Sequence, residues 1–351
     1  MNHELTTSLR AVQDYYGKIL KSNQDLQTSA CCAGESLPEY LRPLLKEIHH
    51  EVKEKFYGCG SPFPLVLRGK TVLDLGSGSG RDAFILAKLV GPEGQVIGLD
   101  MTEEQIAVAN KFVDYHMQLY GYARPNVRFV RGYIEDLATA GITSSSVDVV
   151  VSNCVINLSP AKERVFSEIF RVLKPGGELY FSDVFASRRL PREVSQDPVF
   201  WGECLGGALY IEDFRRQLYA LGCRDYRLTA HSPIQVKQGK MAQLAGASEF
   251  FSLTVRAFKL DLEDRCEDYG QVAVYQGGIP ESPEVFRLDD HHSFERDKPV
   301  LVCGNTAAML EQTRYADFFK ILGNRERHFG LFACAPSSSL AGPQTAPGAC
   351  C

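Results

Sequence analysis

Several features are missing from this chain of 351 residues. No apolar run approaches the roughly 20 residues that a membrane-spanning helix needs, and the N-terminal stretch MNHELTTSLR has no apolar signal-peptide core. The net charge is -5 at pH 7, so there is no basic excess to bind a nucleic-acid backbone. We therefore expect a cytosolic protein with neither a membrane nor a nucleic acid as partner.

The cysteines also lack the spacing that is typical of zinc and redox sites. The chain has 11 cysteines, yet none form a C-x-x-C pair, which removes the strongest zinc and redox spacings. The odd number argues against a scaffold of fully paired disulfides. Thiols that a cytosol keeps reduced can still bind soft metals.

A glycine-rich stretch in the first third of the chain organises the rest. The apolar run Val72–Leu75 predicts a buried strand, and a helical pattern with Ala83, Phe84, Ala87 and Val90 follows. Between them lies Gly-Ser-Gly-Ser-Gly. A strand, a glycine turn and a helix are typical of the first crossover of a doubly wound α/β fold, whose ligands bind at the carboxyl ends of the strands.

The spacing of the glycines disfavours a dinucleotide. The pattern is G-x-G-x-G, with Arg81 where a G-x-G-x-x-G fingerprint has its third glycine. Asp74, at the end of the strand, would repel a pyrophosphate but could hold a cationic group. The stretch therefore fits a sulfonium nucleoside that carries an amino acid better than NAD.

Further strands and helices are predicted around this unit. The expected strands are 94–100, 127–130, 147–152, 178–184, 223–228, 250–260, 271–275 and 299–303. The expected helices are 41–57, one behind a Thr102–Gln105 capping box that carries Ile106 to Met117, one from Ser159-Pro160 to Leu173, and 214–221. Asp100, at the end of its strand, is placed to accept hydrogen bonds from ribose hydroxyls; a turn or cap role is the alternative for it and for Asp74.

Cys154 follows the predicted strand 147–152, opposite the glycine turn. Three interpretations are open: a small buried apolar side chain, a covalent nucleophile, or a ligand that holds the acceptor. No proline precedes it and the net charge is negative, so a nucleic-acid substrate loses support. A small acceptor remains.

The chain resembles known enzymes in two ways. VLDLGSGSGRD, VIGLD, VDVVVSNCVIN and VLKPGGELYFSD, over about residues 71 to 184, resemble motifs of class I S-adenosylmethionine-dependent methyltransferases. That resemblance implies an α/β, Rossmann-like seven-stranded sheet in the order 3-2-1-4-5-7-6 with strand 7 antiparallel. Thiol-bearing stretches further resemble the arsenite methyltransferases: Leu26-Gln-Thr28 with Cys31, Tyr57-Gly-Cys59-Gly, Ser152-Asn-Cys154-Val-Ile-Asn157 and Trp201-Gly-Glu-Cys204-Leu-Gly-Gly207.

The second resemblance implies roles for four cysteines. Cys154 and Cys204 would keep hold of trivalent arsenic, Cys59 would be the third thiol, and Cys31 (or its neighbour Cys32) the N-terminal redox thiol. Cys31 and Cys59 would form a disulfide that thioredoxin or glutathione reduces. The other cysteines, 223, 266, 303 and 334, are expected to be structural.

Roles toward the cofactor, S-adenosylmethionine, are implied in the same way. Asp74 would lie beneath the methionine moiety, Asp100 would bind the ribose, and Met101 would pack by the adenine. The implied cofactor residues are Tyr57, Asp74, Gly76, Ser77, Gly78, Gly80, Asp100, Met101, Ile134, Glu135 and Asn153.

The expected organisation has five parts. These are an N-terminal helical extension (1–70), the cofactor-binding core (71–187), a metalloid-binding region that completes the sheet (188–260), a small α+β domain (261–335) and a flexible tail (336–351). The expected function is methyl transfer to thiol-bound arsenic from arsenite or its thiol conjugates, by a monomer. A methyltransferase of a quinone or sterol and a non-catalytic metalloid binder are the alternatives.

Overall fold

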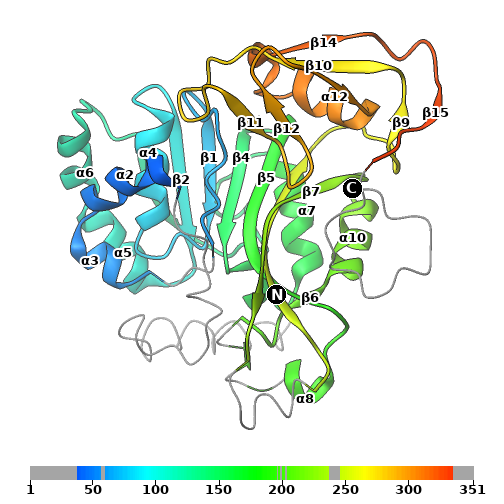
Figure 1. The fold of residues 1–351 in the computed structure, drawn as a ribbon. Coiled ribbons are helices and arrows are strands. Elements are labelled where there is room, and N and C mark those ends of the chain that lie inside the picture. Colours follow the sequence, from blue (N-terminus) through cyan, green and yellow to red (C-terminus); the bar gives the residue numbers. More distant parts are fainter. Residues whose placement is uncertain are drawn as a thin grey trace.

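The computed structural model describes residues 38–56, 60–195, 197, 200–201, 204–236 and 246–334. Residues 1–37 of the predicted N-terminal helical extension, with Cys31 and Cys32, lie outside the described residues, as do Tyr57, Cys59 and the tail. Within them, a central sheet is covered by helices on both faces, and a smaller unit adjoins one edge (Figure 1). No helix in this described part is both long and apolar enough to cross a membrane.

The central sheet has the order β3-β2-β1-β4-β5-β8-β7, and a short β6 pairs with β5. Its strands are β1 Thr71–Leu75, β2 Gln95–Asp100, β3 Val127–Arg131, β4 Val147–Asn153, β5 Leu173–Ala186, β6 Leu209–Tyr210, β7 Tyr226–Ile234 and β8 Phe250–Phe258. The strand β8 runs antiparallel to both β5 and β7. Counted without β6, this is the order implied by the resemblance, with the seventh strand antiparallel as expected.

Side chains of one strand alternate between two apolar cores, one on each face of the sheet. Leu73 and Leu75 of β1 pack with α7 (Lys162–Val172) and α10 (Ile211–Ala220). Val72 faces the opposite core, built with α4 (Arg81–Val90) and α6 (Val113–Tyr120). Alternation with period two is the property of a strand that buries both faces.

Two predicted helices are broken in the structure. The stretch expected to be one helix from 41 to 57 divides into η3 Glu39–Leu41, α2 Arg42–Glu47 and α3 His50–Glu54. The break occurs because Ile48 is extended and buried, and the His49 side chain then caps α3 by accepting a hydrogen bond from the Glu51 amide at 3.3 Å. The second helix ends as α5 (Glu103–Lys111) at Phe112, which is buried and stacks on His49.

Two predicted helix starts also differ. Thr102 is the N-cap residue of α5 but makes no side-chain capping bond, so the capping box does not form. The helix predicted from Ser159-Pro160 begins at Lys162, after the short turn η4 (Ile156–Leu158). Ser159 instead donates its hydroxyl to Glu135 Oε1 at 2.5 Å, which ties the exit of β4 to the loop after β3.

The C-terminal unit has a separate apolar core that includes Tyr275, Phe286 and Phe319. Its elements are β9 Glu267–Asp268, β10 Gln271–Tyr275, β11 Val285–Arg287, β12 Ser293–Glu295, β13 Pro299–Val302, α12 Gly304–Glu311, η5 Ala316–Phe318, β14 Phe319–Leu322 and β15 Gly330–Leu331. The two strands predicted here correspond to β10 and β13. The unit lies over the amino-terminal end of β5, away from the carboxyl ends of the parallel strands (Figure 1).

Buried ion pairs join this unit to the sheet. Glu178 of β5 pairs with Arg256 of β8 at 2.5 Å and also with Arg314 of the C-terminal unit. Arg227 of β7 pairs with Asp225 at 2.8 Å and with Asp289 at 3.1 Å. All of these side chains are at most 5% exposed. Breaking one such pair leaves an unmatched buried charge, so these contacts fix the unit against the sheet.

Candidate active site

A cavity lies at the carboxyl ends of β1, β2 and β4. Strand order reverses between β1 and β4, which is where open α/β sheets bind their ligands. The lining includes Phe56, Asp74, Gly76, Ser77, Gly78, Asp82, Asp100, Met101, Gln105, Ile134, Glu135, Asn153, Cys154, Val155, Leu158 and Ser159. Most of the residues predicted to bind the cofactor are thus brought together here.

The glycine loop shapes one wall of the cavity. Gly76, Gly78 and Gly80 all have positive φ angles, which favour glycine. A Cβ on Gly76 would lie 2.3 Å from Val155, so this glycine lets the loop touch the exit of β4. Gly78 has no atom within 4 Å of such a Cβ, so its face is open toward a ligand. Gly80 does not line the cavity; it caps α4 against Phe129.

Three buried polar atoms of the cavity wall have no hydrogen-bond partner among the described residues: Asp74 Oδ2, Ser77 Oγ and Gln105 Oε1. Buried polar groups are nearly always paired, so unpaired ones in a cavity indicate a ligand. Burial, with Asp82 and Asp100 nearby, raises the pKa of Asp74 well above its usual range. A cationic ligand would relieve that energetic penalty. Gln105, expected to serve a capping box, was missed as a site residue.

Asp100 combines both roles considered for it. Its Oδ2 accepts the Gly78 amide at 2.9 Å and its Oδ1 accepts the Thr102 amide at 2.8 Å, so the carboxylate braces the glycine loop. Burial nevertheless raises its pKa above the ordinary value. Each oxygen has a second lone pair, and both can also accept a hydroxyl from within the cavity.

Asn153, the last residue of β4, holds Gly60 through two hydrogen bonds. Its Oδ1 accepts the Gly60 amide at 3.0 Å, and its Nδ2 donates to the Gly60 carbonyl at 2.9 Å. The same Nδ2 is 3.1 Å from Asp82 Oδ2. Gly60 directly follows Cys59 in the sequence. The Asn153 side chain therefore fixes Gly60 to the end of β4, directly before Cys154.

Cys154 and Cys204 lie next to each other although 50 positions separate them in the sequence. The Cys204 thiol donates to the Cys154 carbonyl at 3.2 Å, and both side chains belong to one buried apolar cluster. Both residues have left-handed backbones, with φ angles of 58° and 63°. Such strain at a non-glycine residue costs of order 1–3 kcal/mol and concentrates at functional sites. Cys154 is disulfide-bonded in this structure, whereas Cys204 is a reduced thiol.

The glycines after Cys204 make this approach possible. A Cβ on Gly207 would lie 1.9 Å from the Asn157 carbonyl oxygen, and one on Gly206 would lie 2.8 Å from the Trp201 amide. Gly206 also donates to the Phe200 carbonyl at 2.7 Å. Gly206 and Gly207 therefore allow close backbone packing, which places Cys204 beside the exit of β4.

Lys162 lies near both Asp183 and Cys204. Neither Lys162 nor Asp183 was predicted as a site residue. Lys162 donates to the Ser159 carbonyl at 2.8 Å, and burial lowers its pKa to about 8 in spite of Asp183, Cys204 and Glu135 nearby. Burial raises the pKa of Asp183 to about 7 although it accepts the Val184 and Asn157 amides. A cation beside a thiol favours its thiolate form. Lys162 and Cys204 are far apart in the sequence and meet only in the folded protein, so no local sequence pattern could have predicted a site role for Lys162.

Comparisons with known proteins agree with this site. A methyltransferase-domain family matches residues 67–241, and the arsenite methyltransferase C-terminal domain family matches residues 268–341. An arsenite methyltransferase of Aquipseudomonas alcaligenes is 54% identical over 323 residues, covering 92% of this chain and 93% of that protein. The Homo sapiens arsenite methyltransferase is 44% identical over 314 residues, covering 88% and 82%.

A crystal structure gives the same result for the fold. The arsenic(III) S-adenosylmethionine methyltransferase from Chlamydomonas reinhardtii matches with a TM-score of 0.82 at 49% identity, covering 85% of this chain and all of that one. The glycine loop and the pair of apposed cysteines lie within residues 67–241, which the methyltransferase-domain family matches. The chain belongs to the arsenite methyltransferase family, within the class I S-adenosylmethionine-dependent methyltransferases.

Proposed function

We propose that this chain transfers methyl groups from S-adenosylmethionine to trivalent arsenic held by the thiolates of Cys154 and Cys204. The observation that carries the proposal is the apposition of these two strained, buried cysteines, of which Cys154 lines a cavity that is suited to a cation and Cys204 donates to the Cys154 carbonyl. The names of the relatives support the same reaction.

The cavity residues fit S-adenosylmethionine. Asp74 and the open face of Gly78 would hold the methionine end, Asp100 the ribose hydroxyls, and Met101, Ile134 and Glu135 the adenine. The unpaired oxygen of Asp74 supports this orientation, because the ammonium group of the amino acid end and the sulfonium of the cofactor are both positively charged. When bound, the cofactor supplies an electrophilic methyl group on a positively charged sulfur.

Arsenic would be held at the end of the cavity formed by the β4 exit. Trivalent arsenic is soft and prefers thiolates, which Cys154 and Cys204 provide side by side. Cys59 is proposed as the third thiol, because Asn153 fastens the neighbouring Gly60 to the strand that carries Cys154. A three-thiolate arsenic keeps a lone pair that can attack the methyl group without a general base.

The protein's contribution is then to position the reactants and to exclude water. Val184, Phe200 and Leu205 surround the two cysteines with apolar side chains. Lys162 supplies the nearby positive charge that favours thiolates as arsenic binds. No step requires a proton to be removed from the arsenic.

Turnover would also need a redox cycle. Methylation formally oxidises arsenic by two electrons, and two thiols can return them by forming a disulfide, for which Cys31 and Cys59 are the proposed pair. Thioredoxin or glutathione would then reduce that disulfide. Cys154 is disulfide-bonded in this structure, so arsenic binding at its sulfur also requires prior reduction. A cytosolic monomer is the proposed working form.

The test is methyl transfer from labelled S-adenosylmethionine to arsenite in the presence of a thiol reductant. We expect methylated arsenic from the wild type and none above background from Cys154→Ser or Cys204→Ser. Cys223→Ser is the matched control, because this thiol is also buried and donates to a carbonyl, at 3.5 Å from Asp225 O, but lies outside the cavity. It should retain activity.

Two outcomes would replace the proposal. A wild type that binds the cofactor but gives no methylated arsenic would point to an organic acceptor, the quinone or sterol alternative. Tight arsenite binding with no transfer to any acceptor would indicate a metalloid-binding protein. Equal losses in Cys154→Ser and Cys223→Ser would show that the thiols matter only for folding.

A further inference from the structure

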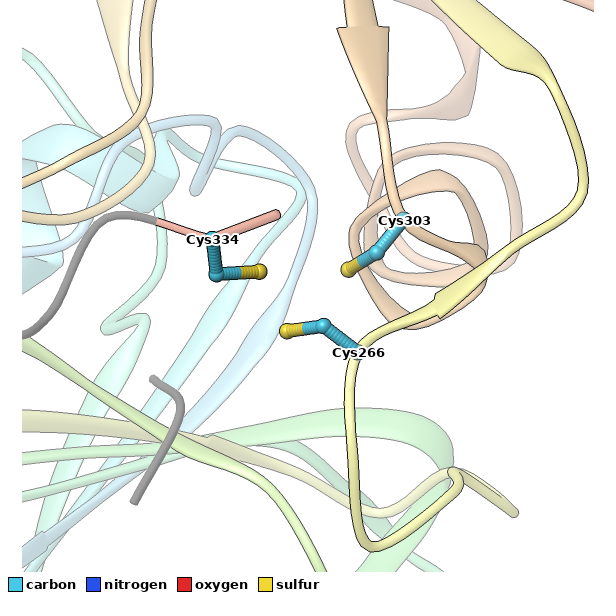
Figure 2. Close-up of side chains that lie close together, drawn as sticks. All are labelled: Cys266, Cys303 and Cys334. Carbon is cyan, nitrogen blue, oxygen red and sulfur yellow. The ribbon is translucent and has the colours of Figure 1, made fainter. Parts of the chain in front are cut away.

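Three cysteines converge in the C-terminal unit, remote in sequence from one another. The sulfur atoms of Cys266, Cys303 and Cys334 all lie within 4.8 Å of one another. Figure 2 shows the three side chains pointing toward a common centre from three separate segments. All three are reduced thiols in this structure, although the sequence predicts only a structural role for them.

The backbone around these cysteines is built to hold them together. The strands β9 and β15 pair at Glu267 and Leu331, and the Phe332 amide donates to the Cys266 carbonyl at 2.8 Å. This pairing brings the segments of Cys266 and Cys334 side by side. None of the three residues has a positive φ angle, so the arrangement carries none of the strain seen at Cys154 and Cys204.

Cys303 is the N-cap residue of α12 and approaches from the other direction. Its sulfur accepts the Thr306 amide at 3.5 Å and is 3.3 Å from the Thr306 hydroxyl. Hydrogen bonds from Cys266 and Cys334 lower the pKa of the Cys303 thiol well below its usual range, and a helix N-terminus also favours a thiolate. Cys303 therefore presents its sulfur to the other two thiols from the start of α12.

The number of ligands limits the ion that fits. Among the described residues, no histidine, fourth cysteine or carboxylate joins the three thiols within this group. Structural zinc is almost always held by four ligands, so it is not satisfied here. Two sulfur ligands that each lie about 2.3 Å from an ion at a near-tetrahedral angle are about 3.8 Å apart. The sulfur atoms here lie within 4.8 Å of one another, so side-chain movements of about 1 Å would bring them to that separation.

The surrounding charges favour a neutral complex. The positive charge of Arg227 acts on Cys303, but Arg227 is already paired with Asp225 and Asp289. Three thiolates around a divalent ion would leave one uncompensated negative charge in a buried setting, which is unfavourable. Three thiolates around a trivalent ion carry no net charge.

We propose that Cys266, Cys303 and Cys334 form a second site for trivalent arsenic, at the opposite edge of the sheet from the cofactor cavity. Arsenous acid would exchange its three hydroxyl groups for three As–S bonds and release three waters, with the thiol protons going to those waters. Arsenic stays trivalent and no reductant is consumed. Cys334 is only partly buried, which gives arsenite a route to the site.

This site goes beyond the proposed methyl transfer, because none of its three cysteines lines the cofactor cavity. The elements β9, β15 and α12, which flank the cysteines, lie in the C-terminal unit, away from the carboxyl ends of the parallel strands (Figure 1). Binding there would stabilise the C-terminal unit by linkage. It would retain arsenite on the enzyme without methylating it. The site would operate even if the acceptor at the cavity proved to be something other than arsenic.

The experiment is to count arsenic atoms per chain by native mass spectrometry on reduced full-length protein incubated with arsenite. Cys303→Ser should carry about one arsenic fewer than the wild type, as should Cys334→Ser, whose partly buried position makes misfolding less of a concern. Cys223→Ser should lose none. The Cys154→Ser/Cys204→Ser variant should keep the arsenic that Cys303→Ser loses, which separates this site from the proposed catalytic one.

Competition with zinc completes the test. Protein preloaded with zinc sulfate should release any zinc held by the cluster when arsenite is added. An equal arsenic count in the wild type, Cys303→Ser and Cys334→Ser would overturn the proposal. So would a zinc ion that depends on Cys303 and resists arsenite, since it would show a zinc site. Initial rates of methyl transfer in Cys334→Ser should stay within about two-fold of the wild type, since the cluster lies far from the cavity.

Discussion

Buried carboxylates near the two ends of the parallel strands have pKa values shifted in opposite directions. The ends are called the carboxyl edge and the amino edge of the sheet. At the carboxyl edge, burial raises the pKa values of Asp74, Asp100 and Asp183. At the amino edge, Asp289 is also buried, yet hydrogen bonding to His292 and the charge of Arg227 overcome that burial and lower its pKa well below the usual range. The difference is that Arg227 and His292 bond directly to Asp289, whereas the Lys162 charge near Asp183 does not offset the burial of that carboxylate.

The cofactor cavity therefore contains carboxylates that lack a cationic partner among the described residues, whereas the carboxylate of the C-terminal unit already has one. Asp74 has an unpaired oxygen facing the cavity, so a cationic cofactor would complete it. Asp289 accepts from Arg227 and His292 and needs nothing further. The cysteines follow the same division. Cys154 and Cys204 are held in strained backbones beside the unmatched charge, whereas Cys266, Cys303 and Cys334 are relaxed beside matched charges.

Removing the matched charge at the amino edge should have a large effect on stability. Asp289→Asn leaves the buried Arg227 short of one partner, and we expect the free energy of unfolding to fall by about 3 kcal/mol at pH 7. Asp261→Asn, at a side chain that is 98% exposed, should change it by less than about 0.5 kcal/mol. Urea denaturation of both variants measures the contrast.

The pH dependence sharpens this prediction. The pKa of Asp289 is lower in the folded than in the unfolded protein, so its contribution is present above the unfolded value of about 4 and is lost as pH falls below it. Asp289→Asn should therefore flatten the acid side of the stability profile. An unchanged profile would mean that Asp289 and Arg227 do not form a matched pair in solution.

Removing the unmatched charge at the carboxyl edge should affect binding more than stability. Asp74→Asn should weaken S-adenosylmethionine binding by about 30-fold or more, the loss of roughly 2 kcal/mol of charge pairing. Because the cation favours ionised Asp74, wild-type affinity should rise with pH through the raised pKa of that group, and the variant should show no such rise.

The controls for Asp74 use calorimetric titration of the same cavity. Glu104→Gln removes an equal charge from the exposed surface of α5 and should leave affinity unchanged. S-adenosylhomocysteine lacks the positive sulfur, so its affinity should depend less on pH. If Asp74→Asn bound both ligands as tightly as the wild type, Asp74 would be a structural carboxylate only.

The smallest expected change concerns Lys162, whose positive charge lies near Cys204. Lys162→Met should move the pH profile of arsenite binding upward by less than about one unit, since the thiolates lose a favourable charge. Lys174→Met removes a partly exposed lysine that pairs with Asp148 at 2.9 Å and should leave the profile in place. Identical profiles for the two variants would remove Lys162 from the site.

The fold was largely predictable because its signals are local. The apolar run Val72–Leu75 and the glycine turn after it occupy adjacent positions, and each later strand repeats the same kind of run. Predictions were wrong where tertiary packing overrode local pattern. Ile48 and Phe112 interrupt helices because each buries its side chain in the core. Gln105 faces the cavity, and so it does not complete the predicted capping box.

The candidate site was predictable only in part. Resemblance named the pair Cys154 and Cys204, and the structure places them in contact. Gln105, Lys162 and Asp183 could not be named, because their roles depend on burial and on neighbours distant in sequence. The roles proposed for Cys31, Tyr57 and Cys59 stay predictions, since these residues lie outside the described part of the chain.

Local order along the chain was thus enough to define the strands, the glycine loop and the cavity edge, since period and turn chemistry act between near neighbours. Folding alone decided which charges are matched and which sulfur atoms meet. Cys266, Cys303 and Cys334 share no spacing motif, and three separate segments must pack before their thiols converge. Electrostatic energy depends on burial and on distance in space, and neither can be read along the sequence.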